Sequence, residues 1–172
     1  MTTLIKSGAL AANPWRTLRA EEAQAGELPQ TGDLIVPLAL WRTQRVALLA
    51  RADRTGVWLQ PSDDPAELVS APPLPDLIAV HFPVFSDGRG YSTARLLRDR
   101  YGFRGELRAI GDILRDQLYE LARCGFDAFE LRADQDPVEA LKAFDDFTEA
   151  YQAANDRGPL FERRFGAQRN IA

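Results

Sequence analysis

The stretch DLIAVHFPVFSDGRGYSTARLLRDRYG, residues 76–102, decides the fold. It starts as a β-rich apolar run, passes through an Asp-Gly-Arg-Gly cluster, and continues as a helix-like pattern that ends at Gly102. A strand that leads through a short turn into a helix is one βα unit, the building block of parallel sheets. The glycine cluster in its middle could bind a ligand at the helix N-terminus, or it could be only the turn.

The same alternation extends on both sides of this unit. Strand-like runs are DLIVP (33–37), VWLQ (57–60), GELRAIG (105–111) and FDAFELRA (126–133), and helix-like segments are 38–52, 62–69, 112–125 and 136–155. About five consecutive βα units predict an α/β fold with a parallel sheet. Five units are too few to close an eight-stranded barrel, so the sheet is either open or a partial, half TIM-like barrel.

The length of 172 residues suits a single domain. We expect a loosely structured N-terminal lead-in over residues 1–31, with one short strand at 3–6. The βα-repeat domain then covers residues 32–155. Residues 156–172 are expected to form a basic, mobile tail.

Composition narrows the class of protein. The chain is 45% hydrophobic and 27% charged with a net charge of −4, which is typical of a soluble globular protein and argues against a nucleic-acid partner. No apolar run reaches the length of a membrane span, and the first residues lack the apolar core of a signal peptide. We therefore expect no membrane contact. A single cysteine fits the reducing cytoplasm.

Metal and cofactor motifs are missing from the sequence. One cysteine, Cys124, and one histidine, His81, are too few for an iron–sulfur cluster or a Cys/His zinc site. Neither a dinucleotide nor a P-loop motif occurs. The sequence therefore predicts no metal and no evident cofactor. A Cys–His nucleophilic pair is rejected because the two residues fall at opposite ends of the sheet, and both are interpreted as structural residues.

Ligands of parallel βα proteins gather at the carboxyl ends of the strands, and polar residues follow three of these strands. Glycines before a helix can expose N–H groups to an anion. Alternatively, Gly88 and Gly90 supply only turn geometry and Ser92 caps the helix. Candidates for acid–base catalysis are Asp87 and Asp112, and candidates for binding a substrate or small anion are Arg89, Gly90, Tyr91, Ser92, Arg115 and Arg132.

Two strands carry charges on one face, unlike fully buried parallel strands. This polar sheet face comprises Glu106, Arg108, Glu130 and Arg132. A ladder of cross-strand ion pairs would place Glu106 near Arg132, or Arg108 near Glu130. Alternatively, the face forms a partly enclosed polar basin or meets a partner.

The chain resembles the bacterial DUF934 family over about residues 31–150, and most specifically in three motifs. These are FxDGRGYS, GELRAxGDxLxDQ and RCGFD, whose positions here include Asp87, Gly88, Arg89, Gly90, Tyr91, Ser92, Arg108, Gly111, Asp112, Asp116 and Gln117. The resemblance implies a part in sulfite reduction, in which the family is described as an oxidoreductase. It supplies no established catalytic residues, so these positions are candidates only.

Three hypotheses follow. The first is an accessory protein of assimilatory sulfite reduction that docks on sulfite reductase or a neighbouring sulfur-assimilation enzyme and has no redox group of its own. The second is an enzyme that binds a small oxyanion-bearing substrate through Asp87, Arg89, Asp112 and Arg132, with a flavin or a partner's cofactor if it is an oxidoreductase. The third is a homodimer in which two half barrels pair their polar faces.

Overall fold

A single curved sheet organises the chain, of which the computed structural model describes residues 4–24 and 28–146. Across the sheet the strands run in the order β2-β1-β8-β7-β6-β5-β4-β3. Neighbours from β3 to β8 are parallel, whereas β1 is antiparallel to both β8 and β2. The strands in the described residues are β1 (Leu4–Lys6), β2 (Ala9–Ala11), β3 (Arg16–Thr17), β4 (Leu34–Pro37), β5 (Thr55–Leu59), β6 (Leu77–Phe82), β7 (Glu106–Gly111) and β8 (Ala128–Glu130).

Helical segments follow each of the five expected strands, so the predicted βα units are confirmed. Between β3 and β4 lies a further short helix, α1 (Ala20–Gln24). The others are α2 (Leu38–Leu49), α3 (Pro65–Val69), α4 (Arg89–Arg95) with its π-helical extension η1 (Leu96–Arg100), the 3₁₀ turn η2 (Arg115–Gln117), α5 (Leu118–Arg123), α6 (Pro137–Leu141) and the 3₁₀ turn η3 (Lys142–Asp145). The sheet curls into a half barrel, as one of the two predicted architectures requires.

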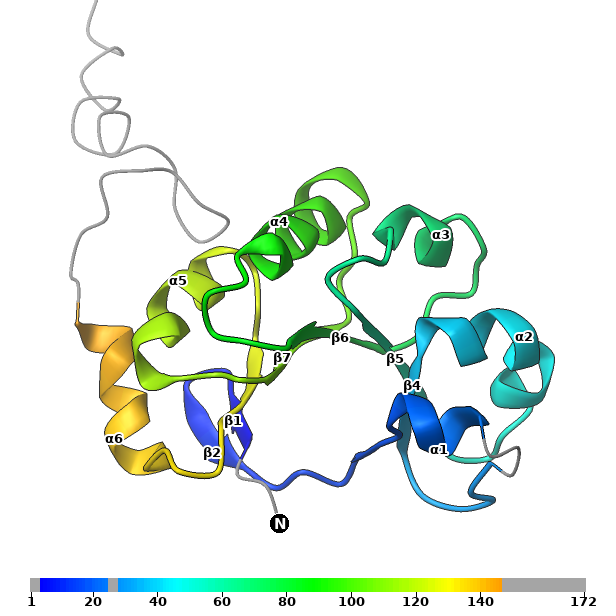
Figure 1. Cartoon of the computed structure of the whole chain (residues 1–172), viewed down its shortest axis with the longest axis horizontal. Coiled ribbons are helices and arrows are strands. Elements are labelled where there is room, and N and C mark those ends of the chain that lie inside the picture. The colour runs from blue at the N-terminus through cyan, green and yellow to red at the C-terminus, as the bar shows by residue number, and fades with distance from the viewer. Residues whose placement is uncertain (1–3, 25–27, 147–172) are drawn as a thin grey trace, which may run out of the picture.

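The two faces of the sheet pack against different parts of the chain and form two separate hydrophobic cores. Figure 1 shows α2, α3, α4 and α5 along the outer side of the curve, while the chain between β2 and α1 runs across the opposite side. Alternation along a strand sends Val57 and Leu59 into the large core under the helices. Trp58, from the same strand, packs with Trp15, Ile35, Leu77, Ala79 and Ile110 in a second core on the concave side.

The N-terminal segment differs from the loosely structured lead-in expected from the sequence. The short strand expected at 3–6 is confirmed as β1, but β2, β3 and α1 follow it. Ile5 is fully buried, and Trp15 is only 9% exposed. The difference arises because β1 and β3 join opposite edges of the sheet, so residues 12–15 must cross the concave side. Strands this short carry too little periodicity to be recognised.

The C-terminal prediction is tested only in part. Asp136 caps α6 through its side chain, with Pro137 in the first helical position as expected. The helix predicted over 136–155 is α6 followed by η3, and its remainder lies outside the described residues. The tail at 156–172 also lies outside them. Among the described residues, no helix is long and apolar enough to cross a membrane.

Candidate functional site

The DGRGYS loop joins β6 to α4, and its glycines have different reasons to be there. A Cβ atom at Gly90 would lie 2.4 Å from the Phe82 ring, so α4 packs on β6 only if this side chain is absent. A Cβ at Gly88 would meet nothing within 4 Å. Neither glycine has a positive φ, so the turn-geometry interpretation of the pair is wrong. Gly90 is required for packing of the helix on the sheet.

The N-terminus of α4 binds a carboxylate of its own chain. The Asp87 side chain accepts hydrogen bonds from the backbone N–H of Arg89 at 3.2 Å and from its guanidinium at 2.7 and 3.0 Å. These hydrogen bonds hold the pKa of Asp87 below its usual value. Asp87 thus satisfies donors that the anion-binding hypothesis assigned to a ligand.

Two further candidates of this loop lie within α4. Ser92 does not cap the helix as expected, because Gly88 occupies the N-cap position and Ser92 lies inside the helix. The ring of Tyr91 packs edge-on against Phe82, with centroids 5.6 Å apart. Burial raises the pKa of the Tyr91 hydroxyl, which lies 3.5 Å from the amide nitrogen of Gln117. These contacts attach the helix to the sheet.

Asp112 and Arg132 meet at the carboxyl ends of β7 and β8, as predicted. Nη1 of Arg132 donates to Oδ1 of Asp112 at 2.8 Å. The other carboxylate oxygen of Asp112 accepts from the backbone N–H of Phe85 at 2.9 Å. The helix expected from residue 112 begins only at η2 and α5, so the expected start was three residues too early. Asp112 therefore ties the β6–α4 loop to the end of β8.

The remaining candidate cation, Arg115, belongs to a different neighbourhood. Its guanidinium forms ion pairs with Asp146 at 2.9 Å and with Asp116 at 3.5 Å. Those hydrogen bonds raise the pKa of Arg115. The described contacts of Arg115 link η2 to the residues after α6, and not to the DGRGYS loop.

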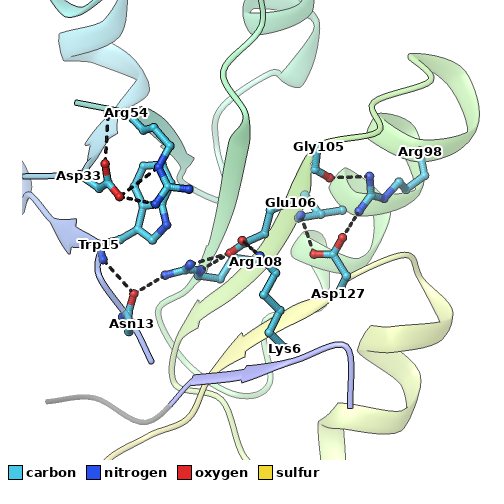
Figure 2. A network of polar contacts seen from close by, with 11 residues as sticks. Lys6, Asn13, Trp15, Asp33, Arg54, Arg98, Gly105, Glu106, Arg108 and Asp127 are labelled. Atoms are coloured by element: carbon cyan, nitrogen blue, oxygen red, sulfur yellow. Dashed lines mark hydrogen bonds and ion pairs between the residues drawn. The ribbon is translucent and has the colours of Figure 1, made fainter. Parts of the chain in front are cut away.

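The polar sheet face predicted from the sequence is present at β7, but its charged residues pair within this strand and not with the neighbouring strand. Arg108 is buried and binds Glu106 through Nε and Nη2 at 2.8 and 2.6 Å. Its Nη1 reaches Oδ1 of Asn13 at 2.9 Å (Figure 2). Lys6 adds a second cation to Glu106 at 2.7 Å. The polar pair therefore faces the protein's own N-terminal segment.

The expected cross-strand ladder does not form in the described part of the chain. Arg108 lies opposite Ala128, and Arg132 is bound to Asp112 and Asp134. One carboxylate oxygen of Glu130 is buried without a hydrogen-bond partner.

A second polar cluster lies at the amino ends of β7 and β8. Asp127 accepts from the backbone N–H of Leu107 at 2.9 Å and from Arg98 at 3.0 Å. Arg98 also donates to the carbonyl oxygen of Gly105 at 2.9 Å (Figure 2). This end of a βα protein usually stabilises the fold and does not carry the chemistry.

A cavity of about 370 Å³ opens on the concave side, at the carboxyl ends of the strands. Three strands line it, with Trp58 from β5, His81 from β6 and Ile110 from β7. The segment at residues 17–21 lines the remaining side and contributes Arg19 and Glu21. None of the predicted site residues lines it. The sequence placed His81 near the end of its strand, but only the packing of residues 17–21 across the strand ends creates a cavity there.

The unique cysteine does not join this cavity. Cys124 is the C-cap of α5 and is half-buried. Burial raises the pKa of its thiol, which keeps it protonated and poorly nucleophilic. Within residues 4–24 and 28–146, no group of His, Cys, Asp and Glu side chains could hold a metal ion.

Fold and site define an α/β half barrel whose N-terminal segment crosses its concave side. The chain belongs to the family described as bacterial protein of unknown function (DUF934), whose model matches residues 56–161. No curated protein and no solved structure matches the chain.

Proposed function

We propose that this chain is a cytoplasmic accessory protein of assimilatory sulfite reduction that docks on sulfite reductase or a neighbouring enzyme. The observation that carries the proposal is an exposed aromatic residue on a fixed loop. Phe85 is 57% exposed and stands beside Val84, which is 51% exposed. The part in sulfite reduction comes from the family resemblance.

The peptide groups of Phe85 are held from both sides. Its N–H donates to Asp112 at 2.9 Å, and its carbonyl oxygen accepts from the Gln117 amide at 3.0 Å. Arg132 in turn fixes Asp112 at 2.8 Å. An aromatic anchor on a fixed backbone loses less conformational freedom on binding than one on a mobile loop. The family motif residues Asp112 and Gln117 thereby support a rigid apolar contact point.

The enzyme hypothesis receives less support from the same geometry. The four side chains proposed for the enzyme site form two ion pairs, Asp87 with Arg89 and Asp112 with Arg132. A general base works best when its pKa lies near the working pH, whereas hydrogen bonds from Arg89 lower the pKa of Asp87. Both carboxylates serve the architecture of the strand ends.

Co-elution with the sulfite reductase hemoprotein tests the docking proposal. We expect a complex with the unmodified chain and at least about tenfold weaker binding for Phe85→Ala, since truncating an anchor costs about 1.4 kcal/mol or more. Val138→Ala is the matched control, because Val138 is also 57% exposed but lies on α6.

Two results would contradict the proposal. One is a protein that elutes alone at micromolar concentration in the presence of the hemoprotein. The other is equal loss of binding in Phe85→Ala and Val138→Ala. A deletion strain that grows normally on sulfate without added cysteine would remove the pathway assignment separately from the docking surface.

A further inference from the structure

The cavity at the strand ends combines an apolar floor with charges at its rim. Trp58 and Ile110 belong to the concave core and are 7% and 6% exposed. The indole N–H of Trp58 donates to the carbonyl oxygen of Leu18 at 2.9 Å, which fixes the ring. A volume of about 370 Å³ is within the range of small-molecule pockets, which is roughly 300–1,000 Å³.

His81 stands beside this floor with its ring accessible. The imidazole meets the Trp58 ring edge-on at 5.6 Å. In the described part of the chain the ring makes no hydrogen bond. Its two nitrogens are also not among the buried polar atoms that lack a partner, so both are accessible. Gly111 leaves room beside the ring, because a Cβ there would lie 2.9 Å from its Cδ2 and 3.1 Å from its Nε2. The imidazole can therefore hydrogen-bond a molecule in the cavity.

Charges of both signs line the same cavity. Arg19 and Glu21 are exposed, and within residues 4–24 and 28–146 neither side chain forms an ion pair or hydrogen bond, although the charge of Arg19 helps to lower the pKa of Glu22. By contrast, Arg16 and Glu22, from the same segment, form an ion pair with each other at 3.0 Å. A monovalent ion of either sign would meet one attractive and one repulsive charge here. A zwitterion can satisfy both.

We propose that this cavity binds a zwitterionic α-amino acid with an apolar side chain. The apolar body lies on Trp58 and Ile110, the carboxylate pairs with Arg19, and the ammonium group pairs with Glu21. His81 hydrogen-bonds the polar end. This site is separate from the docking loop, so either proposal can fail without the other.

The unique histidine makes the test direct, because the imidazole proton resonances of the full chain come from His81 alone. The probes are L-leucine and L-phenylalanine. Each is compared with the analogue that lacks the amine, 4-methylpentanoate or 3-phenylpropanoate, and with the analogue that lacks the carboxylate, 3-methylbutylamine or 2-phenylethylamine. We expect saturable shifts with at least one amino acid and about tenfold or weaker affinity for both of its analogues.

Variants separate the two charges. Arg19→Gln and Glu21→Gln should each weaken binding of that amino acid about tenfold. Arg19→Gln should not further weaken binding of the analogue that lacks the carboxylate, and Glu21→Gln should not further weaken binding of the analogue that lacks the amine. Arg16→Gln is the control, because Arg16 lies on the same segment but outside the cavity. The proposal is overturned if neither amino acid gives a saturable shift, or if the deaminated acids bind as tightly as the amino acids.

Discussion

The guanidinium of Arg108 donates a 2.9 Å hydrogen bond to the side-chain oxygen of Asn13, 95 residues earlier in the chain. The same oxygen accepts from the backbone N–H of Trp15 at 3.2 Å. Arg108 is 1% exposed and sits on β7 in the middle of the concave face. One buried cation thus holds the crossing segment against the sheet and neutralises Glu106.

Arg108→Ala should lower the free energy of unfolding by about 3–5 kcal/mol, because it leaves the largely buried Glu106 carboxylate without its buried partner. Urea denaturation measures the change. Arg89→Ala is the control, since its side chain is 64% exposed and ion pairs this open to solvent contribute little to stability. Equal effects of the two substitutions would show that Arg108 does not hold the segment in place.

Gly90→Ala should destabilise the protein by about 1–3 kcal/mol, because its new methyl group would collide with the Phe82 ring. Gly88→Ala, two residues earlier, should change the free energy of unfolding by less than about 0.5 kcal/mol, since nothing lies within 4 Å. Thermal or urea unfolding of both variants tests the difference. If Gly88→Ala proved the more damaging, the packing role of Gly90 would be refuted.

His81 should titrate below its usual pKa of 6.5, because burial disfavours the charged imidazolium. Unfolding then takes up a proton, so the contribution of His81 to stability is complete above pH 6.5 and declines as the pH falls through the folded-state pKa. A proton NMR titration gives the folded-state pKa directly. His81→Gln should remove this part of the pH dependence, and a folded-state pKa at or above 6.5 would contradict the prediction.

The Asp134 carboxyl should titrate with a pKa of about 2, because Arg132 donates two hydrogen bonds to it. Arg132→Gln should move that pKa back toward 3.8. Carbon-detected NMR titration of the aspartate carboxyls reports both values. An Asp134 pKa that Arg132→Gln leaves unchanged would contradict the prediction.

The sequence predicted the parallel sheet because β4 to β6 are apolar runs bounded by turn residues, and each is followed by a helical pattern. It could not predict the course of residues 4–17. Trp15 and Asn13 acquire their roles only when β1 and β3 reach opposite edges of the sheet. Such roles depend on tertiary neighbours, which local periodicity does not encode.

The candidate site was also predictable only in part. That Asp112 and Arg132 lie near one another followed from the ends of neighbouring parallel strands, but their ion pair was not predicted, since Arg132 was expected to pair with Glu106. The function of Gly90 did not, because the residue it accommodates, Phe82, is recognised only once α4 packs on β6. His81 was interpreted as a structural residue, since no pattern indicated that residues 17–21 would build a cavity wall beside it.

The pairing of β1 with β8 also dictates an order of assembly. Leu4 pairs with Glu130, so the N-terminal hairpin has no sheet edge to join until nearly the whole half barrel has been synthesised. Pairings this distant in sequence slow folding, because a long loop must close before they form. During synthesis the first strand of the chain is therefore among the last to find its place in the sheet.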